Sequence, residues 1–598
     1  MEERYLNLLK TWCDRLLDFQ IDGVERLDGA ILCPACMTIH GRCQDLIYPL
    51  LCLADRTGEE RYLTAARRLF VWGGSLVCDD GSFYNDAQSS WNGITVFAAI
   101  VLCESLEQHG HLLDEETREA FECRMKAAGH WIYENLTMDF VTNINYHATT
   151  AAAMALLGNY EDREDYRERA REMAASCLKH ITADGLFYGE GKPMEAVSRR
   201  GCRPVDIGYN VEESLPALLQ YARAMKDEEA LIRVKEVLLH HLEFMLPDGG
   251  WDNSFGTRNF KWTYWGSRTS EGCQTAYGVW GSEEPVFAEA AYRNLCLYEA
   301  CTTRDGLLAG GPDYERFGEA ACVHHAFCHS KALAAALDAG IGSWEREQLP
   351  SEKAQALQYY PTIDTYKVAQ GDWLATVTGY DVEYCKGGHA TGGTLSLLWN
   401  KGWGPVIAAG MTDYSLYEAH NMQQVQRKHM HRSLVPRLEW KNESAVYAQC
   451  YDDEAQVTAE PLNAEEPGVR MRVRGCLRDI RHQEPPVSMP YQITFQFTPE
   501  GVKIRIQMEQ PGKPVHFLLP LIAPHSALCM EEPMRLGWRK GGETVVLQTT
   551  NPVHAAAPVF NLVGGFEAWE CEIPLDKDGR LECSVCCSAL PEGRSKIK

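Results

Sequence analysis

The stretch DGLFY, residues 184–188, recurs with small changes along the first half of the chain. In each copy an Asp-Gly pair, which is a strong turn signal, precedes apolar or aromatic residues. The other copies are DGAIL at 28–32, DGSFY at 80–84, DGGWD at 248–252 and DGLLA at 305–309, with a degenerate MDFVTN at 138–143. Counted from the aspartates at 28, 80, 139, 184, 248 and 305, the intervals are 52, 59, 45, 64 and 57 residues. Intervals of this length fit two helices and their connections.

Each of these turns separates two segments with helical periodicity. The segments before the turns have charged faces and cover 3–20, 59–74, 115–136, 162–180, 228–246 and 284–302. The segments after the turns are richer in small and apolar residues and cover 42–55, 92–109, 144–158, 209–226, 268–280 and 318–338. Six such pairs predict an (α/α)6 toroid over residues 1–345, with the apolar helices lining the ring. All six loops should then open at one end of the ring and bring their polar side chains together.

The character of the sequence changes after residue 345. A polar, proline-containing connection is followed by runs in which apolar and polar residues alternate. These runs include TYKVAQ (365–370), WLATVTGY (373–380), GTLSLLW (393–399), VRMRVRG (469–475), YQITFQF (491–497) and VKIRIQM (502–508). The pattern predicts an antiparallel β-sandwich over residues 346–598, placed where it contributes to the active-site cleft.

Composition narrows the class of protein. The chain has 83 Asp and Glu residues and 58 Lys and Arg residues. The resulting net charge of −25 disfavours nucleic acid and anionic membranes as partners. No apolar run is long enough for a membrane helix, and the amphipathic start does not read as a secretion signal. The 23 cysteines are odd in number and scattered through the expected helices. This pattern is typical of free thiols in a protein of a reducing compartment. We therefore expect a soluble cytoplasmic protein, with a homo-oligomer as one possible state.

The first loop, CPACMTIHGRC (33–43), places Cys33, Cys36, His40 and Cys43 together. A C-x2-C pair with a nearby histidine is typical of zinc sites, but this spacing is tighter than in structural zinc patterns. The alternative is that the thiols pack beneath the loop, and we predict no metal and no other cofactor. His40 and Arg42 stand just before an inner helix, so both are candidate substrate-binding residues.

The second and third loops combine amides, a carboxylate, an indole and an imidazole. Asp86 and Trp91 in DGSFYNDAQSSWNG suit a sugar, which stacks on rings and needs paired hydrogen bonds. Asn145 and His147 begin an Ala-rich inner helix, where they would enter the ring. The alternatives are a helix-capping turn for the polar residues and a buried core histidine for His147.

The fourth loop contributes carboxylates and a tyrosine. Glu190 and Asp206 lie in the loop, and Tyr209 and Glu212 share a helix face at i and i+3. A carboxylate facing an apolar ring should have a raised pKa, as a general acid needs. The alternative for Glu212 and its neighbour Glu213 is that one of them complements the helix dipole.

The fifth loop, DNSFGTRNFKWTYWGSRTSEG (252–272), is rich in cations and aromatic rings. Arg258, Lys261 and Arg268 would bind a carboxylate, and Trp262 would help to form a stacking wall. The alternative is a solvated loop with internal ion pairs. In the β domain, glycines flank His389 in GGHATGG, and this histidine is expected to reach into the ring.

Two stretches carry a family resemblance. DIGYNVEESLPALLQYA (206–222) and FGTRNFKWTYWGSRTSEGC (255–273) resemble glycoside hydrolase family 154, which implies exo-β-glucuronidase activity on uronate-bearing glycans. The architecture, together with GGHATGGTLSL (387–397), is similar to that of the heparinase II/III-like polysaccharide lyases.

Two reaction classes follow from these residues. A hydrolase would use two carboxylates across the glycosidic bond, drawn from Glu190, Asp206, Glu212 and Asp252. A lyase would neutralise the uronate with Asn145 or an arginine, abstract the C5 proton with His147 or His389, and protonate the leaving oxygen with Tyr209. We expect the hydrolase because carboxylates abound in loops four and five; a non-catalytic glycan-binding protein is the third possibility.

Overall fold

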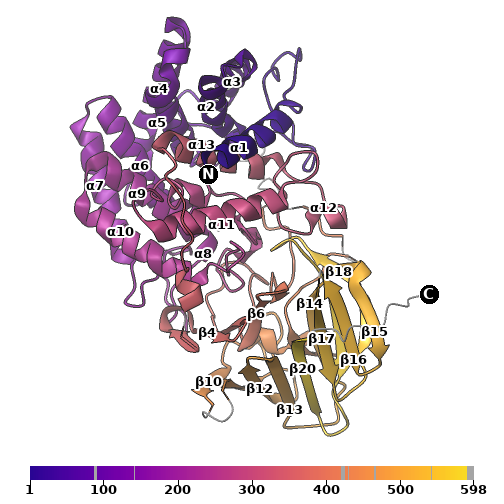
Figure 1. The fold of residues 1–598 in the computed structure, drawn as a ribbon. Coiled ribbons are helices and arrows are strands. Elements are labelled where there is room, and N and C mark those ends of the chain that lie inside the picture. Colours follow the sequence, from indigo (N-terminus) through magenta and orange to yellow (C-terminus); the bar gives the residue numbers. More distant parts are fainter. Residues whose placement is uncertain are drawn as a thin grey trace.

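A computed structural model describes residues 1–85, 91–140, 142–353, 355–418, 424–427, 430–462, 467–540 and 542–588. The helices of the first half form one body and the strands of the second half pack against it (Figure 1). Within these ranges no helix has the length and apolar character needed to cross a membrane. The last long helix, α13 (Val323–Ala339), and the first strand after it, β3 (Leu357–Tyr360), bracket the passage between the two parts.

The long helices form two concentric layers, and the toroid prediction is confirmed. The outer helices are α1 (Glu2–Leu17), α3 (Glu60–Gly73), α5 (Glu115–Asn135), α7 (Glu164–Cys177), α10 (Glu228–His241) and α11 (Pro285–Cys301). The inner helices are α2 (Ile47–Thr57), α4 (Thr95–His109), α6 (Ile144–Tyr160), α9 (Leu215–Met225) and α13. Each inner helix contacts the next in the order α13, α2, α4, α6, α9. Their apolar surfaces are buried on nearly all sides, as a ring interior requires.

The fifth inner position is not a helix, contrary to the expectation for 268–280. It contains a single 3-10 turn, Cys273–Thr275, which contacts both α13 and the π-helical turn Asn210–Ser214 that precedes α9, and so closes the ring. Gly272 enters this turn at φ +101°, outside the helical region. The segment before it is bonded to the β domain through Arg268, which donates to the Leu562 carbonyl at 2.8 Å.

The Asp-Gly turns are built alike, which explains the repeat in the sequence. Single antiparallel bridges close four of them: Val77–Phe83, Ile181–Phe187, Met245–Trp251 and Thr302–Leu308. In these turns and in the first one, the glycine adopts a φ between +76° and +95°. Residues other than glycine rarely adopt this conformation, so the Asp-Gly pair marks five of the six chain reversals between the layers.

The second half is an antiparallel β domain, as predicted, with its strands in three main sheets. One sheet has the order β3-β4-β5-β6-β7, from β3, β4 (Thr365–Gln370), β5 (Trp373–Thr378), β6 (Thr394–Asn400) and β7 (Gly404–Ala408). The second has the order β18-β19-β14-β8-β9, from β18 (His554–Asn561), β19 (Phe566–Pro574), β14 (His516–Ile522), β8 (Arg437–Lys441) and β9 (Val446–Ala448).

The largest sheet has eight strands, in the order β10-β11-β12-β13-β20-β17-β16-β15. They are β10 (Gln456–Pro461), β11 (Val469–Cys476), β12 (Pro490–Thr498), β13 (Gly501–Met508), β20 (Arg580–Ser588), β17 (Glu543–Thr549), β16 (Arg535–Lys540) and β15 (Leu528–Glu532). Strand β12 alternates buried and half-buried residues along its length. All three sheets contribute side chains to one apolar cluster, so the domain has a common core.

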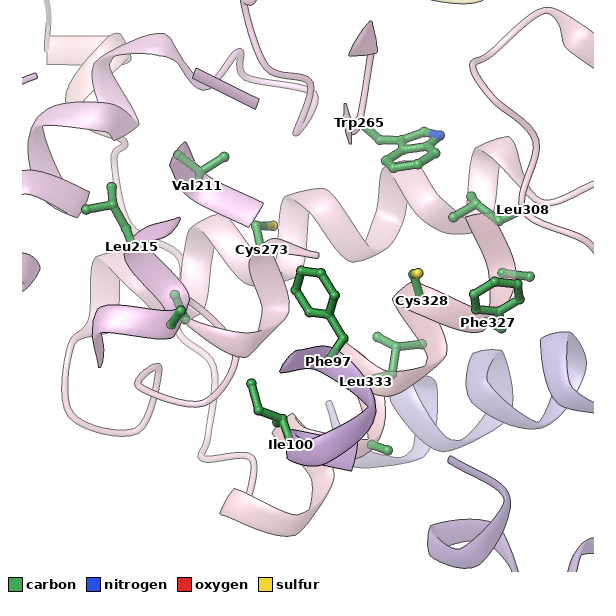
Figure 2. Close-up of a cluster of buried hydrophobic side chains, with 14 of the residues drawn as sticks. Phe97, Ile100, Val211, Leu215, Trp265, Cys273, Leu308, Phe327, Cys328 and Leu333 are labelled. Atoms are coloured by element: carbon green, nitrogen blue, oxygen red, sulfur yellow. The ribbon is translucent and has the colours of Figure 1, made fainter. Parts of the chain in front are cut away.

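The ring has its own continuous core. Figure 2 shows side chains from α4, from α13 and from the turn segments between them, including Phe97, Leu333, Trp265 and Cys273, gathered around the ring interior. Trp265 is fully buried and donates its indole N–H to the Ala309 carbonyl at 2.9 Å. The helical layers and the fifth loop therefore belong to one packed unit.

The Asp-Gly turns are expected to tolerate no side chain at the glycine. We predict that Gly249→Ala lowers the free energy of unfolding by about 2–5 kcal/mol, because a Cβ there would lie 2.3 Å from the Arg293 carbonyl oxygen at a φ of +88°. The matched control is Gly201→Ala, which has a φ of +85° and open space around the new Cβ, and should cost about 1–2 kcal/mol. Urea unfolding of both variants measures the difference, and equal losses would contradict the close-approach explanation.

Candidate active site

A cavity of about 400 Å³ opens where the inner helices begin. Its wall is made by the first turns of inner helices, by loops of the ring and by three residues of the β domain. The lining residues are Arg42, Asn85, Trp91, Ile94, Phe97, Thr142, Asn143, Asn145, Tyr146, Lys192, Tyr209, Glu213, Arg258, Lys261, Thr269, His324, Tyr384, Tyr417 and Glu418. The predicted convergence of the loops at one end is therefore present. Helix N-termini and four basic side chains make the site suitable for an anion.

A buried tyrosine between two cations forms one wall of the cavity. The guanidinium of Arg258 lies 3.6 Å from the centre of the Tyr209 ring, and Lys261 donates to the Tyr209 hydroxyl at 3.2 Å. The hydroxyl is also hydrogen-bonded to Thr269. Burial raises the pKa of Tyr209 well above its usual value, so the phenol carries its proton. Burial also lowers the pKa of Lys261 to about 8.

Asn145 and Glu213 form a second buried pair at the cavity. The Asn145 amide donates to the Glu213 carboxylate. Burial raises the pKa of Glu213 to about 7, against the opposing effect of Arg42. A carboxyl group with this pKa exchanges its proton near neutrality and, when protonated, can donate a hydrogen bond to an anionic ligand.

His324 is one of the cavity residues that the sequence patterns did not single out. It lies in the first turn of α13, and neither ring nitrogen has a hydrogen-bond partner among the described residues. Its pKa lies well below the usual histidine value, first because of burial and then because of nearby groups that include Arg42. A neutral imidazole with free nitrogens in an anion site can accept a proton. His324 lies at the start of an inner helix, and this position, which had identified Asn145, could also have identified His324.

Two further predicted binding residues line the cavity. Arg42 stacks over Phe97 at 4.0 Å and is ion-paired with Asp45 and Glu271, so its charge is largely compensated inside the protein. Trp91 is 37 % exposed and donates its indole N–H to the Tyr146 hydroxyl at 2.8 Å, which orients an aromatic face at the rim. Asp86 lies outside the described residues.

The carboxylates expected to perform hydrolysis all lie outside the cavity lining. Asp206 accepts hydrogen bonds from the backbone N–H groups of Tyr209 at 2.9 Å and Arg258 at 2.8 Å. It therefore holds the backbone of these two residues in place. Glu190 is fully buried and pairs with Arg258 at 3.1 Å. Asp252 accepts from Ser254 and Thr376 and fastens the loop to β5.

Glu212 also points away from the cavity, and a π-helical turn explains why. The backbone of Asn210–Ser214 has π geometry, which adds residues to the turn and places Glu213 on the cavity side together with Tyr209. The i, i+3 relation assumed from the sequence therefore selected the wrong glutamate. Glu212 instead accepts hydrogen bonds from the Ser267 backbone at 2.7 Å and from the Ser270 hydroxyl.

The two histidines predicted to be catalytic lie outside the cavity lining. His147 bonds the Phe140 carbonyl at 3.2 Å through Nε2 and lies outside the cavity lining, as the core-histidine alternative expected. His389 bonds the carbonyls of Val382 and Ala390 and stacks on Tyr380 with ring centres 5.0 Å apart. Both ring nitrogens of His389 are thus engaged within the β domain.

The fifth loop divides into a functional part and a structural part. Arg258 and Lys261 line the cavity as predicted, whereas Trp262 and Arg268 do not. Trp262 is fully buried and donates to the Trp251 carbonyl at 3.0 Å. Arg268 donates to the Leu562 carbonyl of the β domain at 2.8 Å. One of the three cations, Arg268, therefore links the loop to the β domain, and Trp262 is packed inside the protein instead of stacking on a ligand.

The first loop places its histidine behind the cavity wall. His40 is buried and stacks against His324 with ring centres 5.4 Å apart, but it lies outside the cavity lining. Its Nε2 lies 3.5 Å from the sulfur of Cys322. The contact with substrate predicted for His40 is therefore replaced by a contact with a cysteine of the ring.

The cation-lined cavity between the helical ring and the β domain has a lining that suits an acidic ligand. Family models for the ulvan lyase N-terminal domain and the ulvan lyase C-terminal domain match residues 9–355 and 357–588. The chain is 37% identical over 590 residues to a broad-specificity ulvan lyase of Formosa agariphila, a match that covers 95% of this chain and 91% of the relative. The chain belongs to the ulvan lyase family.

A solved structure shares the architecture. A heparinase III structure matches with a TM-score of 0.52 at 11% identity, covering 97% of this chain and 84% of that chain. A mutant of the heparan sulfate lyase HepC from Pedobacter heparinus matches with a TM-score of 0.49 at 11% identity, covering 98% and 84%. The predicted likeness to heparinase-type architecture is thus consistent with the first of these structures, and this likeness concerns the fold alone.

The assignment to glycoside hydrolase family 154, and with it the exo-β-glucuronidase function, is wrong. The family match overturns it, and the site provides the physical reason. Among the described residues of the cavity lining, the carboxylates are Glu213 and Glu418, and each is already paired, with Asn145 and with Lys261 respectively. A glycosidase needs two carboxylates free to act on either side of the bond.

Adjacent glutamates offer a test of this arrangement. We predict that Glu212→Gln lowers the free energy of unfolding by about 1.5–3 kcal/mol. The reason is that the amide nitrogen of glutamine cannot accept the hydrogen bonds that Ser267 and Ser270 now donate to the carboxylate. Glu213→Gln keeps an acceptor for Asn145 and should change stability by less than about 1 kcal/mol, since only one hydrogen bond is altered. Urea unfolding of the two variants decides the question; a larger loss for Glu213→Gln would contradict the assigned orientations.

Proposed function

We propose that this enzyme is a polysaccharide lyase that cleaves a uronate-bearing acidic polysaccharide by β-elimination. The observation that carries the proposal is the Tyr209 hydroxyl, which is held by Lys261 and Thr269 in a cation-lined cavity without a free pair of described carboxylates. The similarity to a broad-specificity ulvan lyase supports ulvan as the first substrate to assay.

In this reaction the proton on C5 of the uronate leaves first, and the charge that develops on the carboxylate must be stabilised. The ammonium of Lys261 and the guanidinium of Arg258 supply positive charge in a buried site, where it acts more strongly than in water. Glu213, when protonated, and Asn145 add hydrogen-bond donors. Together these groups would make the C5 proton more acidic.

His324 is the proposed base. Its imidazole is neutral and both nitrogens are without described partners, so it can take the C5 proton without losing an existing hydrogen bond. The electron pair of the C5–H bond then forms the C4–C5 double bond while the bond from C4 to the glycosidic oxygen breaks. His324 takes the place that the sequence patterns had given to His147 and His389.

Tyr209 is the proposed acid. Its phenol is protonated at rest and can donate to the departing glycosidic oxygen. The resulting phenolate would be stabilised by Lys261, 3.2 Å from the hydroxyl, and by Arg258 against the ring face. Proton exchange with solvent restores both residues, and no water molecule enters the products.

Removal of the phenol tests the proposal. We predict that Tyr209→Phe lowers kcat on ulvan by about 10²–10⁴-fold, as expected for loss of a general acid, while the Kd of the polysaccharide changes little. The ultraviolet absorbance of the unsaturated uronate reports turnover, and calorimetry reports binding. Tyr384→Phe, at another tyrosine of the cavity, is the matched control and should lose less than tenfold. Full activity of Tyr209→Phe would reject Tyr209 as the acid.

The buried lysine should set the alkaline limit of activity. Lys261 is charged below its pKa of about 8 and neutral above it, so kcat/KM should fall as the pH rises through about 8. Lys261→Arg keeps the charge and should move this limb to higher pH, whereas Lys192→Arg, at the other cavity lysine, should leave the limb in place. A pH–rate profile with the same limb in Lys261→Arg would contradict the role given to Lys261.

A further inference from the structure

We propose that Cys33, Cys36, His40 and Cys322 bind a zinc ion that fastens the first loop of the ring to its last inner helix. The sequence places the first three residues close together, but the fourth is 282 residues beyond His40. The fold brings all four ligand atoms within 4.8 Å of one another. Cys43, which the sequence pattern had grouped with them, lies outside this set.

The distances match a tetrahedral zinc site. Zn–S bonds of about 2.3 Å and Zn–N bonds of about 2.0–2.1 Å at tetrahedral angles require S···S separations of ~3.8 Å and S···N separations of ~3.6 Å. The Cys322 sulfur lies 3.5 Å from that of Cys33 and 3.6 Å from that of Cys36, and 3.5 Å from His40 Nε2. These sulfurs are too far apart for disulfide bonds, which measure about 2.05 Å.

The backbone of the first loop is shaped to present both thiols on one side. The Cys33 N–H donates to the Thr38 carbonyl and the Met37 N–H donates to the Cys33 carbonyl, each at 2.9 Å. The Cys36 N–H points at the Cys33 sulfur at 3.4 Å, where it would stabilise a thiolate. Cys33, Cys322 and His40 are buried, so these polar ligand atoms are withdrawn from water.

The ligand set indicates a structural site. Three thiolates and one neutral imidazole fill the four positions of zinc and leave none for substrate or water. Binding would release the three thiol protons to solvent and leave a complex of net charge −1. The zinc would therefore contribute stability and position, not chemistry.

The site lies directly behind the proposed active site. Arg42 and His324 each follow a ligand by two residues, and the His40 ring contacts the His324 ring. A metal at this point would hold the beginning of α13 against the first loop, and so fix two residues of the cavity wall. This inference does not depend on the proposed lyase reaction, since zinc content and stability are measured without substrate.

Two other clusters of candidate ligands occur among the described residues. Asp45, Glu271 and Cys328 lie together, but Arg42 and Lys331 already neutralise the two carboxylates. Cys52, His109 and Asp338 also lie together, but Asp338 is engaged by Tyr48 and Arg56. Positively charged side chains therefore already pair with the carboxylates of both clusters, whereas the cysteine-rich set contains no carboxylate.

Elemental analysis of the full chain, purified with a non-thiol reductant and reloaded with zinc, tests the proposal. We expect one zinc per wild-type chain after dialysis, its loss in Cys322→Ser and in Cys33→Ser, and its retention in Cys43→Ala, the matched control from the same loop. A strong chelator should lower the Tm of the wild type and leave that of Cys322→Ser unchanged.

Several outcomes would overturn the zinc site. They are wild type without zinc after reloading, Cys322→Ser with a full equivalent, and a disulfide among Cys33, Cys36 and Cys322 in the reduced preparation. If Cys322→Ser fails to fold, cobalt loaded into the wild type decides instead. Thiolate-to-cobalt charge-transfer bands and the visible bands of tetrahedral cobalt would support the site, and an octahedral spectrum would reject it.

Discussion

The burial of three cations in the loop 252–272 is the constraint on which the rest of the structure depends. A charge removed from water needs a partner, and each of these charges finds one at a distance in the sequence. Arg258 pairs with Glu190 of the fourth loop, Lys261 pairs with Glu418 of the β domain, and Arg268 binds the Leu562 carbonyl of that domain. The same contacts link the fourth and fifth loops, join the two domains and leave two cations facing the cavity. The loop is therefore both the joint between the domains and a wall of the active site.

The fold could be predicted from the sequence because its signal is local and repeated. Each Asp-Gly turn needs a glycine at positive φ, and each helix pair has a polar and an apolar member, so the two-layered ring follows from short-range patterns. The pattern failed at the fifth inner segment, 268–280, which contains a single 3-10 turn and whose first residue, Arg268, is bonded to the β domain. Such contacts are long-range and leave no periodicity in the segment itself.

The site could be predicted in part, and the errors have physical causes. Tyr209 and Asn145 could be placed by their position near the starts of inner helices, and Arg258 and Lys261 by their position in the fifth loop. The choice between Glu212 and Glu213 depended on a π-helical turn that the sequence does not announce. Hydrolysis was predicted because the loops contain many carboxylates. Their number does not show which of them can contact a substrate. Asp206, for example, accepts hydrogen bonds from two backbone N–H groups and is not available for catalysis. The predicted cytoplasmic location remains a prediction.

The mass of the products formed from ulvan by the wild-type enzyme tests the proposed chemistry most directly. Elimination divides the chain without adding water, so the product masses should sum to the mass of the substrate and one new end should carry an unsaturated uronate. Products whose summed mass exceeds that of the substrate by one water for each bond cut, with a saturated uronate at the new end, would contradict the assignment of Tyr209 and His324 and restore hydrolysis.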